Sequence, residues 1–423
     1  MPLTSWRAGQ RPAWIAVPAA ALVLSLAACT SGASGRHDAS GASQAPATSA
    51  PAIPVLVVGA APAPSASDTP NSEPVSYGSP VLVTVRQGQL TAVQVSVKAG
   101  GQELEGGIAA DGRSWVSEAA PRPATTYQVV ASVTDETGAA RSLTKVFTIP
   151  TVPEDQRLGF SVTPDDHQTV GVGQPIVVRF LTPVSNRAGI EKAMQVTTRT
   201  KAGATVEGSW SWLSATEAHW RPKQFWTPGT SVTLDMRLAG VQASAHRWGR
   251  KDYSETFTIG PSHVTQVDAA AHRIRIYRDG KLVNEWLTGT GRKGLETYSG
   301  TYIVLGKAPV VVMDSCSARI TCDKKNPDYY NEKEHWATRI TASGTFLHAA
   351  GWDGLLGKAN VSHGCVHLSD ANAQEFYDHA VKGDVVVVRN TGRGPGERIA
   401  TQDPGLYDWN VSWQAWLSKS ALH

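Results

Sequence analysis

A cysteine lies between two histidines in the sequence SHGCVH, which occupies residues 362–367 of a 423-residue chain with four cysteines. A free thiol titrates near pH ~8.5, so a nucleophilic cysteine needs a base or a positive charge beside its sulfur. Histidine supplies either one near neutral pH. Another histidine, His348, lies fifteen residues before His363 in a segment typical of a strand. These residues predict a nucleophile, Cys365, and a candidate base, His348.

The backbone beside Cys365 could also stabilise negative charge. Gly364 has no side chain to crowd a developing oxyanion, and the N–H groups of Gly364 and Cys365 are candidate donors. The residue after the candidate base, Ala349, has no side-chain acceptor. We therefore expect a backbone carbonyl to orient the His348 ring.

These residues have two other interpretations. A lone cysteine in a folded domain is usually a small buried hydrophobe, but the flanking Gly and His argue against that here. His348, His363, Cys365 and His367 could be zinc ligands. The Cys-x-x-Cys and His-x-x-x-His spacings typical of zinc sites are missing from this stretch. We predict no metal and no cofactor.

The same residues resemble the signature of the L,D-transpeptidase catalytic domain of bacterial cell-wall enzymes. The resemblance continues in the segments 299–303, 312–315, 336–338 and 408–410 and in Tyr330, which are similar to actinobacterial members with N-terminal immunoglobulin-like modules. It is close over about 260–416 and rests on architecture alone over 53–259.

The resemblance implies a peptidoglycan L,D-transpeptidase. Its substrates would be stem tetrapeptides, as donor and as acceptor, joined by 3→3 cross-links with release of D-Ala, and carbapenem-type β-lactams would acylate it. It implies no cofactor. It assigns catalysis to Cys365, His348 and His363, and oxyanion or substrate contacts to Gly364, Tyr330, Ser362, His367, Met313 and Trp336.

Two alternative functions stay open at this point. An L,D-carboxypeptidase would form the same acyl-enzyme and use water as acceptor. A cell-wall-binding lipoprotein without catalytic activity would need no activated thiol. The product formed from a purified disaccharide-tetrapeptide distinguishes the first, and the reactivity of Cys365 the second.

One residue departs from the family pattern. Many members carry Asn or Arg two residues after the cysteine, where this chain has His367. An imidazole titrates near pH ~6.5. On an extended segment, residues two apart point to the same face, so His367 could act on the Cys365 thiolate and on a substrate carboxylate. The alternative is that the loop turns and His367 hydrogen-bonds the scaffold.

Composition narrows the classes of partner. The chain has 39 Lys and Arg against 36 Asp and Glu, a formal net charge of +3. No stripe of Arg or Lys accompanies it, so we expect no nucleic-acid partner. The length allows two to four domains.

The first 29 residues have the pattern of a lipoprotein signal peptide. Arg7 and Arg11 precede an apolar run, 13–28, that ends in LAAC, with Cys29 as the lipidation site. An ordinary secretory signal is the alternative. Both place the mature protein outside the cytoplasm, and lipidation would anchor it to the outer face of the membrane. Residues 30–52 are rich in Ser, Ala, Gly, Thr and Pro, which predicts a flexible tether.

The next two segments, 53–150 and 151–260, share one pattern. Short alternating runs are separated by turn residues, and the modules end alike, in VFTI and in ETFTI. This pattern predicts two β-sandwiches in tandem, and the resemblance makes them immunoglobulin-like. The expected strands are 81–85, 93–97, 127–133 and 143–149 in the first, and 176–180, 206–212, 232–236 and 254–259 in the second. Residues 62–74 are expected to form a long loop.

The third segment, 261–391, is the expected catalytic domain. The fold class is thus mainly β: two tandem immunoglobulin-like β-sandwiches, then a β-rich L,D-transpeptidase domain with few helices. Asp279-Gly280 between two strand-like runs predicts a tight hairpin. Ser369 or Asp370 could cap a helix over 371–382 that Gly383 ends, and 384–388 reads as a buried strand.

A long excursion over about 313–340 is, by resemblance, the lid over Cys365. It holds Cys316 and Cys322, whose five intervening residues allow a small disulfide-closed loop in an oxidising compartment. We predict that disulfide, with two free thiols as the alternative.

The C-terminal tail, 392–423, holds Trp409, Trp413 and Trp416 at helical spacing. Because the tail lacks a basic face, we expect it to pack on the preceding domains. Contact with a membrane surface is the alternative.

Overall fold

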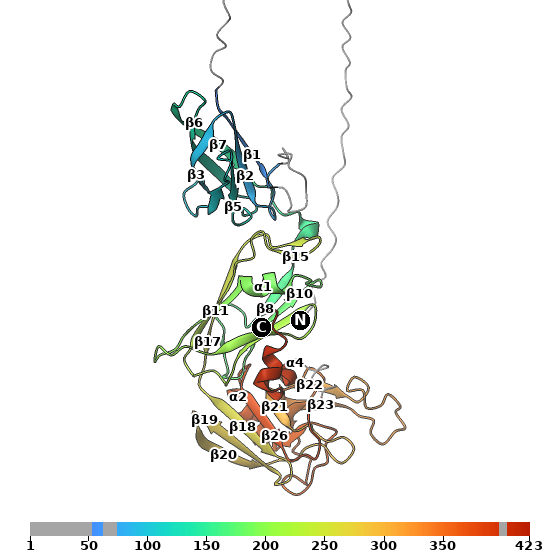
Figure 1. Cartoon of the computed structure of the whole chain (residues 1–423). Helices are drawn as coiled ribbons and strands as arrows, with labels where there is room; N and C mark the ends of the chain where they lie inside the picture. The colour runs from blue at the N-terminus through green and yellow to red at the C-terminus, as the bar shows by residue number, and fades with distance from the viewer. Residues whose placement is uncertain (1–52, 62–73, 397–403) are drawn as a thin grey trace, which may run out of the picture. The chain divides into compact units, whose positions relative to one another are not determined.

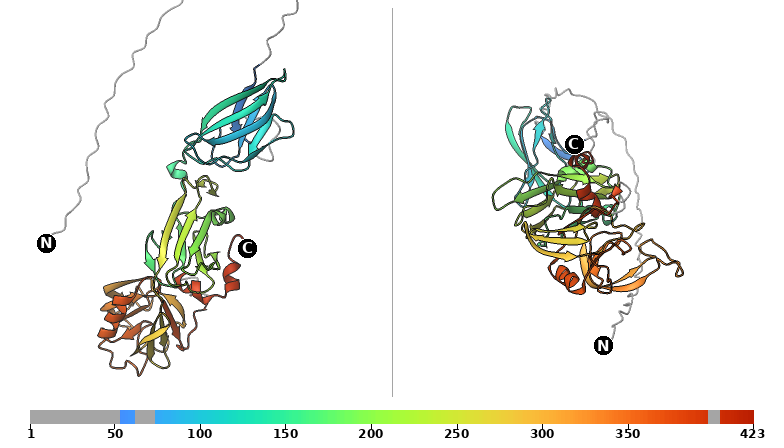
Figure 2. Two further views of the ribbon diagram at one scale, coloured as in Figure 1. Left: turned by 90° about the vertical axis from the view of Figure 1, so that its left-hand side faces the viewer. Right: turned by 90° about the horizontal axis from the view of Figure 1, so that it is seen from below.

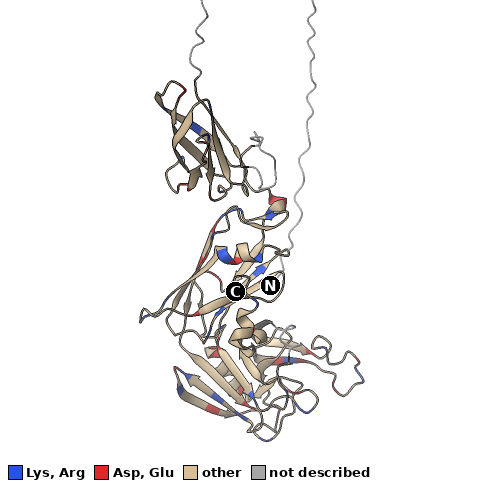
Figure 3. Ribbon diagram, in the orientation of Figure 1, with Lys and Arg blue, Asp and Glu red and all other residues tan. Residues whose placement is uncertain are grey.

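The computed structural model describes residues 53–61, 74–396 and 404–423 (Figure 1). The signal-peptide, lipidation and tether predictions therefore lie outside the described residues, as does nearly all of the loop expected over 62–74. No described helix has the length and apolar character needed to cross a membrane. Figure 3 shows Lys and Arg interspersed with Asp and Glu along the described elements.

The first sandwich pairs a four-stranded sheet with a three-stranded sheet (Figure 1). The strands are, in sheet order, β1 (Val55–Ala60), β2 (Val81–Arg86), β5 (Ser114–Ser117) and β4 (Gly106–Ile108), and then β3 (Gln89–Val97), β6 (Thr126–Thr134) and β7 (Ala140–Thr148). Along β6 every second side chain, from Tyr127 to Val133, is buried. This alternation fills one core between the two sheets.

The second sandwich has two four-stranded sheets and a short helix. The strands are, in sheet order, β12 (Gly208–Trp212), β13 (Glu217–Pro222), β10 (Ile176–Phe180) and β8 (Phe160–Thr163), and then β11 (Met194–Arg199), β14 (Ser231–Met236), β17 (Tyr253–Ile259) and β9 (Thr169–Val170). The 3₁₀ helix η1 (Glu154–Gln156), the helix α1 (Arg187–Ala193) and the two-stranded ribbon β15 (Gln242–Ser244) with β16 (Arg247–Trp248) complete it.

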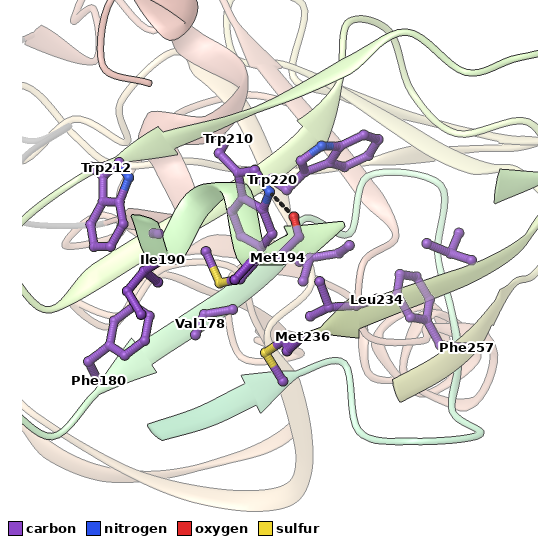
Figure 4. Close-up of a cluster of buried hydrophobic side chains, with 14 of the residues drawn as sticks. Val178, Phe180, Ile190, Met194, Trp210, Trp212, Trp220, Leu234, Met236 and Phe257 are labelled. Atoms are coloured by element: carbon purple, nitrogen blue, oxygen red, sulfur yellow. Dashed lines mark hydrogen bonds between the residues drawn. The ribbon is translucent and has the colours of Figure 1, made fainter. Parts of the chain in front are cut away.

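Tryptophans form much of the core of this sandwich (Figure 4). Trp210 is buried, and its indole N–H donates to the carbonyl of Met194 at 3.0 Å. Trp220 stacks on Trp226 with ring centroids 5.2 Å apart. A large ring with one satisfied polar atom fills the space between sheets without leaving an unpaired donor.

The third domain carries the sequence SHGC and consists of two further sheets and one helix (Figures 1 and 2). The strands are, in sheet order, β20 (Lys281–Leu287), β19 (Arg273–Arg278), β18 (His263–Asp268), β26 (Val385–Arg389) and β21 (Gly300–Ile303), and then β22 (Gly306–Asp314), β23 (Asn331–Arg339), β24 (Phe346–Ala349) and β25 (Val366–Leu368); the helix is α2 (Asp370–His379). The mainly β fold class is thereby confirmed, and each expected strand overlaps an observed one.

The hairpin at Asp279-Gly280 is confirmed. Both residues have positive φ, 46° and 78°, and the flanking strands β19 and β20 pair antiparallel. Two consecutive left-handed residues give the turn whose twist matches that of the strands. The hairpin places β20 at the edge of the five-stranded sheet.

The expected helix over 371–382 is too long. Ser369 is the N-cap, accepting from the Asn372 N–H at 3.3 Å, but the helix ends at His379. Ala380 is already extended, and the Val381 N–H donates to the Asp384 carboxylate at 2.9 Å. That side-chain acceptor replaces the helical one, so the chain turns toward β26 before Gly383 is reached.

The excursion over 313–340 is more ordered than expected. Strands β22 and β23 pair from Gly306 with Arg339 out to Asp314 with Asn331, so only 315–330 forms the connecting loop. Within it, Cys316 and Cys322 are joined by a disulfide.

The tail forms two short helices, so the expectation of a single helix face for its tryptophans is wrong. Helix α4 (Pro404–Asn410) ends before Ser412, which caps α5 (Trp413–Leu417) by accepting from the Ala415 N–H. The three indoles nevertheless converge. The Arg221 guanidinium lies 4.8, 5.1 and 4.5 Å from the ring centroids of Trp409, Trp413 and Trp416.

The tail packs on the second sandwich. The Trp416 side chain is fully buried, and its indole N–H donates to the Ser209 carbonyl at 2.9 Å. The indole N–H of Trp409 donates to the Gly173 carbonyl at 2.8 Å. Indoles held by both packing and hydrogen bonds are not available to a membrane surface.

Candidate active site

The parallel pairing of β24 with β25 builds the centre of the site. It places His348 beside His367 in register, and Cys365 directly before β25. Cys365 is a half-buried free cysteine whose sulfur lies 3.8 Å from the Gly344 carbonyl oxygen. The sulfur also lies close enough to the His348 ring to raise the pKa of that ring. The pairing of two segments that are separate in sequence therefore brings a thiol and an imidazole together.

His348 is held at one ring nitrogen, Nδ1. The side chain is buried, and Nδ1 lies 2.9 Å from the Ala349 carbonyl oxygen, so the expected backbone acceptor is confirmed. The same Nδ1 lies 3.3 Å from Oε2 of Glu334, a buried residue of β23 that the sequence analysis missed. Glu334 is the last of three consecutive charged residues on β23, 332–334, and the sequence alone did not indicate which of them is buried.

The surroundings favour a positive charge on His348. Burial alone would lower its pKa, but the hydrogen bonds and negative charges of Cys365 and Glu334 raise that pKa to about 10. An imidazolium facing a cysteine sulfur is the arrangement that favours a thiolate nucleophile.

Ser362 shapes the loop around the thiol. Its hydroxyl donates to the Cys365 carbonyl at 2.7 Å and accepts from the Gly364 N–H at 3.1 Å. Gly364 has a φ of +127°, a conformation that L side chains rarely adopt. Because the Gly364 N–H is already engaged, the Cys365 N–H is the better candidate of the two expected oxyanion donors.

His363 and Tyr330 form a second group on the lid side. Their ring centroids are 4.9 Å apart, and His363 Nε2 lies 3.7 Å from the Asp328 carboxylate. Burial, and then the charge of Arg292, lower the pKa of His363. Burial, and then the charge of Cys365, raise the pKa of Tyr330 to about 12, so its phenol stays protonated and can donate.

His367 lies behind the site. It is 4% exposed, and its Nδ1 lies 2.9 Å from Asp353 Oδ2. Its ring centroid is 5.0 Å from that of His348 and 5.3 Å from that of Trp352. Burial, and then the charge on His348, lower its pKa. This placement does not fit the expected contact with a substrate carboxylate, because β25 turns the ring into the domain; it fits the scaffold alternative.

The remaining two expected contacts lie at opposite ends of the lid hairpin. Met313 is half-buried near the loop end of β22 and pairs with Glu332. Trp336 has a positive φ of 52° and packs against the Tyr377 ring, with centroids 5.4 Å apart. Trp336 also lines a pocket of about 690 Å³ with Glu334, Ala349, Trp352 and others.

The histidines and the cysteine do not converge as metal ligands would. Within 53–61, 74–396 and 404–423, no group of three or more His, Cys, Asp and Glu side chains is arranged to hold a metal ion. His363 faces the lid, while His348 and His367 face each other edge to face.

Comparison with known protein families finds one match in the N-terminal part of the chain and another in the C-terminal part. Residues 72–242 match a bacterial Ig domain, and residues 262–388 match the L,D-transpeptidase catalytic domain. The Ig match extends across parts of both sandwiches, and the catalytic match ends within β26.

Curated relatives of the chain are mycobacterial. L,D-transpeptidase 2 of Mycobacterium tuberculosis (strain CDC 1551 / Oshkosh) is 34% identical over 358 residues, which is 84% of this chain and 84% of that protein. Probable L,D-transpeptidase 3 of M. tuberculosis (strain ATCC 25618 / H37Rv) is 33% identical over 256 residues, 56% of this chain and 90% of that one. A solved LD transpeptidase in complex with imipenem is 31% identical, covers 55% of this chain and 99% of that chain, and has a TM-score of 0.48.

Proposed function

The chain belongs to the L,D-transpeptidase family of peptidoglycan enzymes, and we propose that it forms 3→3 cross-links through an acyl-enzyme on Cys365. The observation that carries the proposal is the pairing of the Cys365 thiol with the buried, oriented ring of His348 inside a matching catalytic domain. A thiol, a base and a group that orients the base are the parts that nucleophilic acyl transfer requires.

In the first half-reaction, the Cys365 thiolate attacks the carbonyl between the third residue of the donor stem and its terminal D-Ala. The S–C bond forms, and the Cys365 N–H and the protonated Tyr330 phenol donate to the oxyanion. The C–N bond then breaks, and D-Ala leaves as an amine that takes the proton of His348.

In the second half-reaction, the side-chain amine of an acceptor stem attacks the thioester. Neutral His348 takes the proton that the amine loses, the S–C bond breaks, and the thiolate faces an imidazolium again. Protons therefore balance over the cycle. Ser362 holds the backbone of the Cys365 loop by hydrogen bonds, and His363 packs against Tyr330 on the lid side of the thiol.

The test is the product formed from a purified disaccharide-tetrapeptide, measured by mass spectrometry. A cross-linked dimer that has lost one D-Ala is expected. A tripeptide without dimer would replace the proposal by the L,D-carboxypeptidase alternative. Unchanged substrate, with Cys365 no more reactive than a model thiol, would favour the wall-binding alternative.

Carbapenem-type β-lactams should acylate Cys365, because the strained ring presents a carbonyl to the same thiolate. The relative solved with imipenem shares 31% identity with this chain. Intact-mass measurement after incubation should show one adduct per chain. Quantitatively unmodified protein would contradict this part of the proposal.

The family acts on the cell wall and is extracytoplasmic, and the sequence of residues 1–29 supports anchoring by a lipid on Cys29. The tether, 30–52, and the two sandwiches, 53–150 and 151–260, would then hold the domain over 261–391 away from the membrane. Membrane partitioning of the wild type and loss of it in Cys29→Ala are expected. A Cys29→Ala protein that stayed membrane-bound would contradict lipid anchoring.

A further inference from the structure

Glu334 is a buried carboxylate next to the catalytic pair. Its neighbours on β23, Glu332, Lys333 and His335, are all exposed, whereas Glu334 is 7% exposed. Burying a carboxylate is costly unless a partner stabilises its charge. Within the described residues, His348 is the cationic side chain that lies within ion-pair distance of Glu334.

Two acceptors lie at one nitrogen of His348, and they have different effects on the ring. The Ala349 carbonyl, 2.9 Å from Nδ1, is the closer partner and fixes the tautomer and the orientation of the ring. It is neutral, so it contributes little to the free-energy difference between imidazole and imidazolium. Glu334 Oε2, 3.3 Å from Nδ1, brings a full negative charge that favours the imidazolium.

We propose that Glu334 is a positioning residue of the reaction, which acts through His348 to stabilise the imidazolium that faces Cys365. The inference rests on the roles assigned above to Cys365 and His348, and adds a third, charged member to them. Each time His348 takes a proton, from the thiol or from the acceptor amine, the Glu334 charge stabilises the product of that transfer.

The other charged groups around His348 leave this role to Glu334. From the Cys365 loop the ring meets the thiol, and from β25 it meets His367 edge to face. His367 has a lowered pKa and is bonded to Asp353, so that carboxylate is directed at His367 rather than at His348. On the lid side, Tyr330 faces Cys365 and His363.

The test compares Glu334→Gln with Glu332→Gln in the full chain. The rate of alkylation of Cys365 by iodoacetamide is measured from pH 5.5 to 10.5 by mass spectrometry of the Cys365 peptide, which separates this thiol from Cys29. Glu334→Gln should react about 10-fold more slowly than wild type near pH 7, because the pKa of His348 falls when the Glu334 charge is removed and the imidazolium–thiolate pair loses population.

The two rates should converge, within about twofold, above the pH of about 10 at which wild-type His348 has itself lost its proton. A distortion of the site would lower the rate at both ends of the profile. Glu332→Gln removes an exposed charge two residues away on the same strand and should stay within about twofold of wild type throughout. Glu334→Asp, which keeps the charge on a shorter side chain, should recover part of the loss at pH 7.

Three outcomes would overturn the proposal. They are equal rates for Glu334→Gln and Glu332→Gln near pH 7, a loss in Glu334→Gln that is as large at pH 10.5 as at pH 7, and a Glu334→Asp rate no better than that of Glu334→Gln. A wild-type Cys365 that reacts no faster than a model thiol would instead contradict the proposed function, so the two failures are distinguishable. Thermal unfolding of each variant checks that it is folded.

Discussion

Two buried histidines of this chain have carboxylate neighbours and raised pKa values, yet only one of them has a ring nitrogen left for chemistry. His219, on β13, lies between Asp408 Oδ1 at Nδ1 and Glu217 Oε1 at Nε2, both at 2.7 Å. His348, on β24, has the Ala349 carbonyl and the Glu334 carboxylate at Nδ1. Its ring also interacts with the Cys365 thiol.

The two rings differ in whether they can give a proton to a reacting group. Burial alone would lower the pKa of His219, but Asp408 and Glu217 raise it to about 9, and both nitrogens donate to carboxylates. That ring ties the tail to the second sandwich, since Asp408 belongs to α4. His348 can pass a proton to and from the thiol without losing its orienting partner. Both histidines therefore have a raised pKa. The partner of the second ring nitrogen distinguishes the catalytic histidine, His348, from the structural one, His219.

Cys365→Ala should have the largest effect. Because the sulfur is the nucleophile that forms the acyl-enzyme, turnover and covalent acylation by a carbapenem should both be lost. Unfolding temperature should change little, since Cys365 is only half-buried. A stoichiometric carbapenem adduct in this variant would remove Cys365 from the mechanism.

His348→Ala should lower kcat by at least about 100-fold, the scale of a lost general acid–base group. The steady-state rate of cross-linked dimer formation measures it. If turnover stayed near the wild-type rate, the proton-transfer role would have to move to another residue, with His363 the next candidate.

His219→Ala should have the opposite profile. It leaves the fully buried Asp408 carboxylate without its partner, so the free energy of unfolding should fall by about 3–5 kcal/mol. Well below its unfolding temperature, the variant should keep kcat within about threefold of wild type. Denaturant unfolding and dimer formation measure the two quantities, and a kcat loss as large as that of His348→Ala would erase the contrast between the two rings.

The contribution of His219 to stability should depend on pH. Its folded pKa of about 9 exceeds the unfolded value near 6.5, so its contribution is fully present below pH ~6.5 and is lost as pH rises through about 9. Glu217, whose pKa is lowered in the fold, loses its contribution as pH falls below about 4.5. The difference in unfolding temperature between wild type and His219→Gln should therefore shrink by roughly half or more from pH 6 to 9.5. A constant difference would contradict the ion-pair account.

His367→Asn should have the smallest effect. Because His367 is buried against Asp353 and lies behind His348, we expect acylation rates within about threefold of wild type. The pH–rate profiles of the two proteins should superimpose. An added inflection near pH 6–7 that only wild type shows would mean that the ring titrates in contact with the reacting groups.

The local elements of this fold could be predicted from sequence because short-range physics decides them. Alternation placed the strands of both sandwiches, Asp279-Gly280 placed a hairpin, and Ser369 placed a helix start. Helix ends were less predictable. The α2 helix stops where Asp384 captures a backbone N–H, and the tail helix breaks at Ser412, both through side-chain contacts that spacing alone does not specify.

The sequence by itself determined the chemistry that is available: a cysteine and a histidine in family-like motifs, a glycine beside the thiol, and a backbone acceptor after His348. Only the tertiary structure decided which carboxylate serves which ring. Glu334 reaches His348 through the register of β23, Asp353 reaches His367, and Asp408 reaches His219 across 189 residues of chain. The physical reason is that a side chain's type fixes what it can donate or accept, whereas its partner depends on distances of 3 Å set by strand pairing and packing.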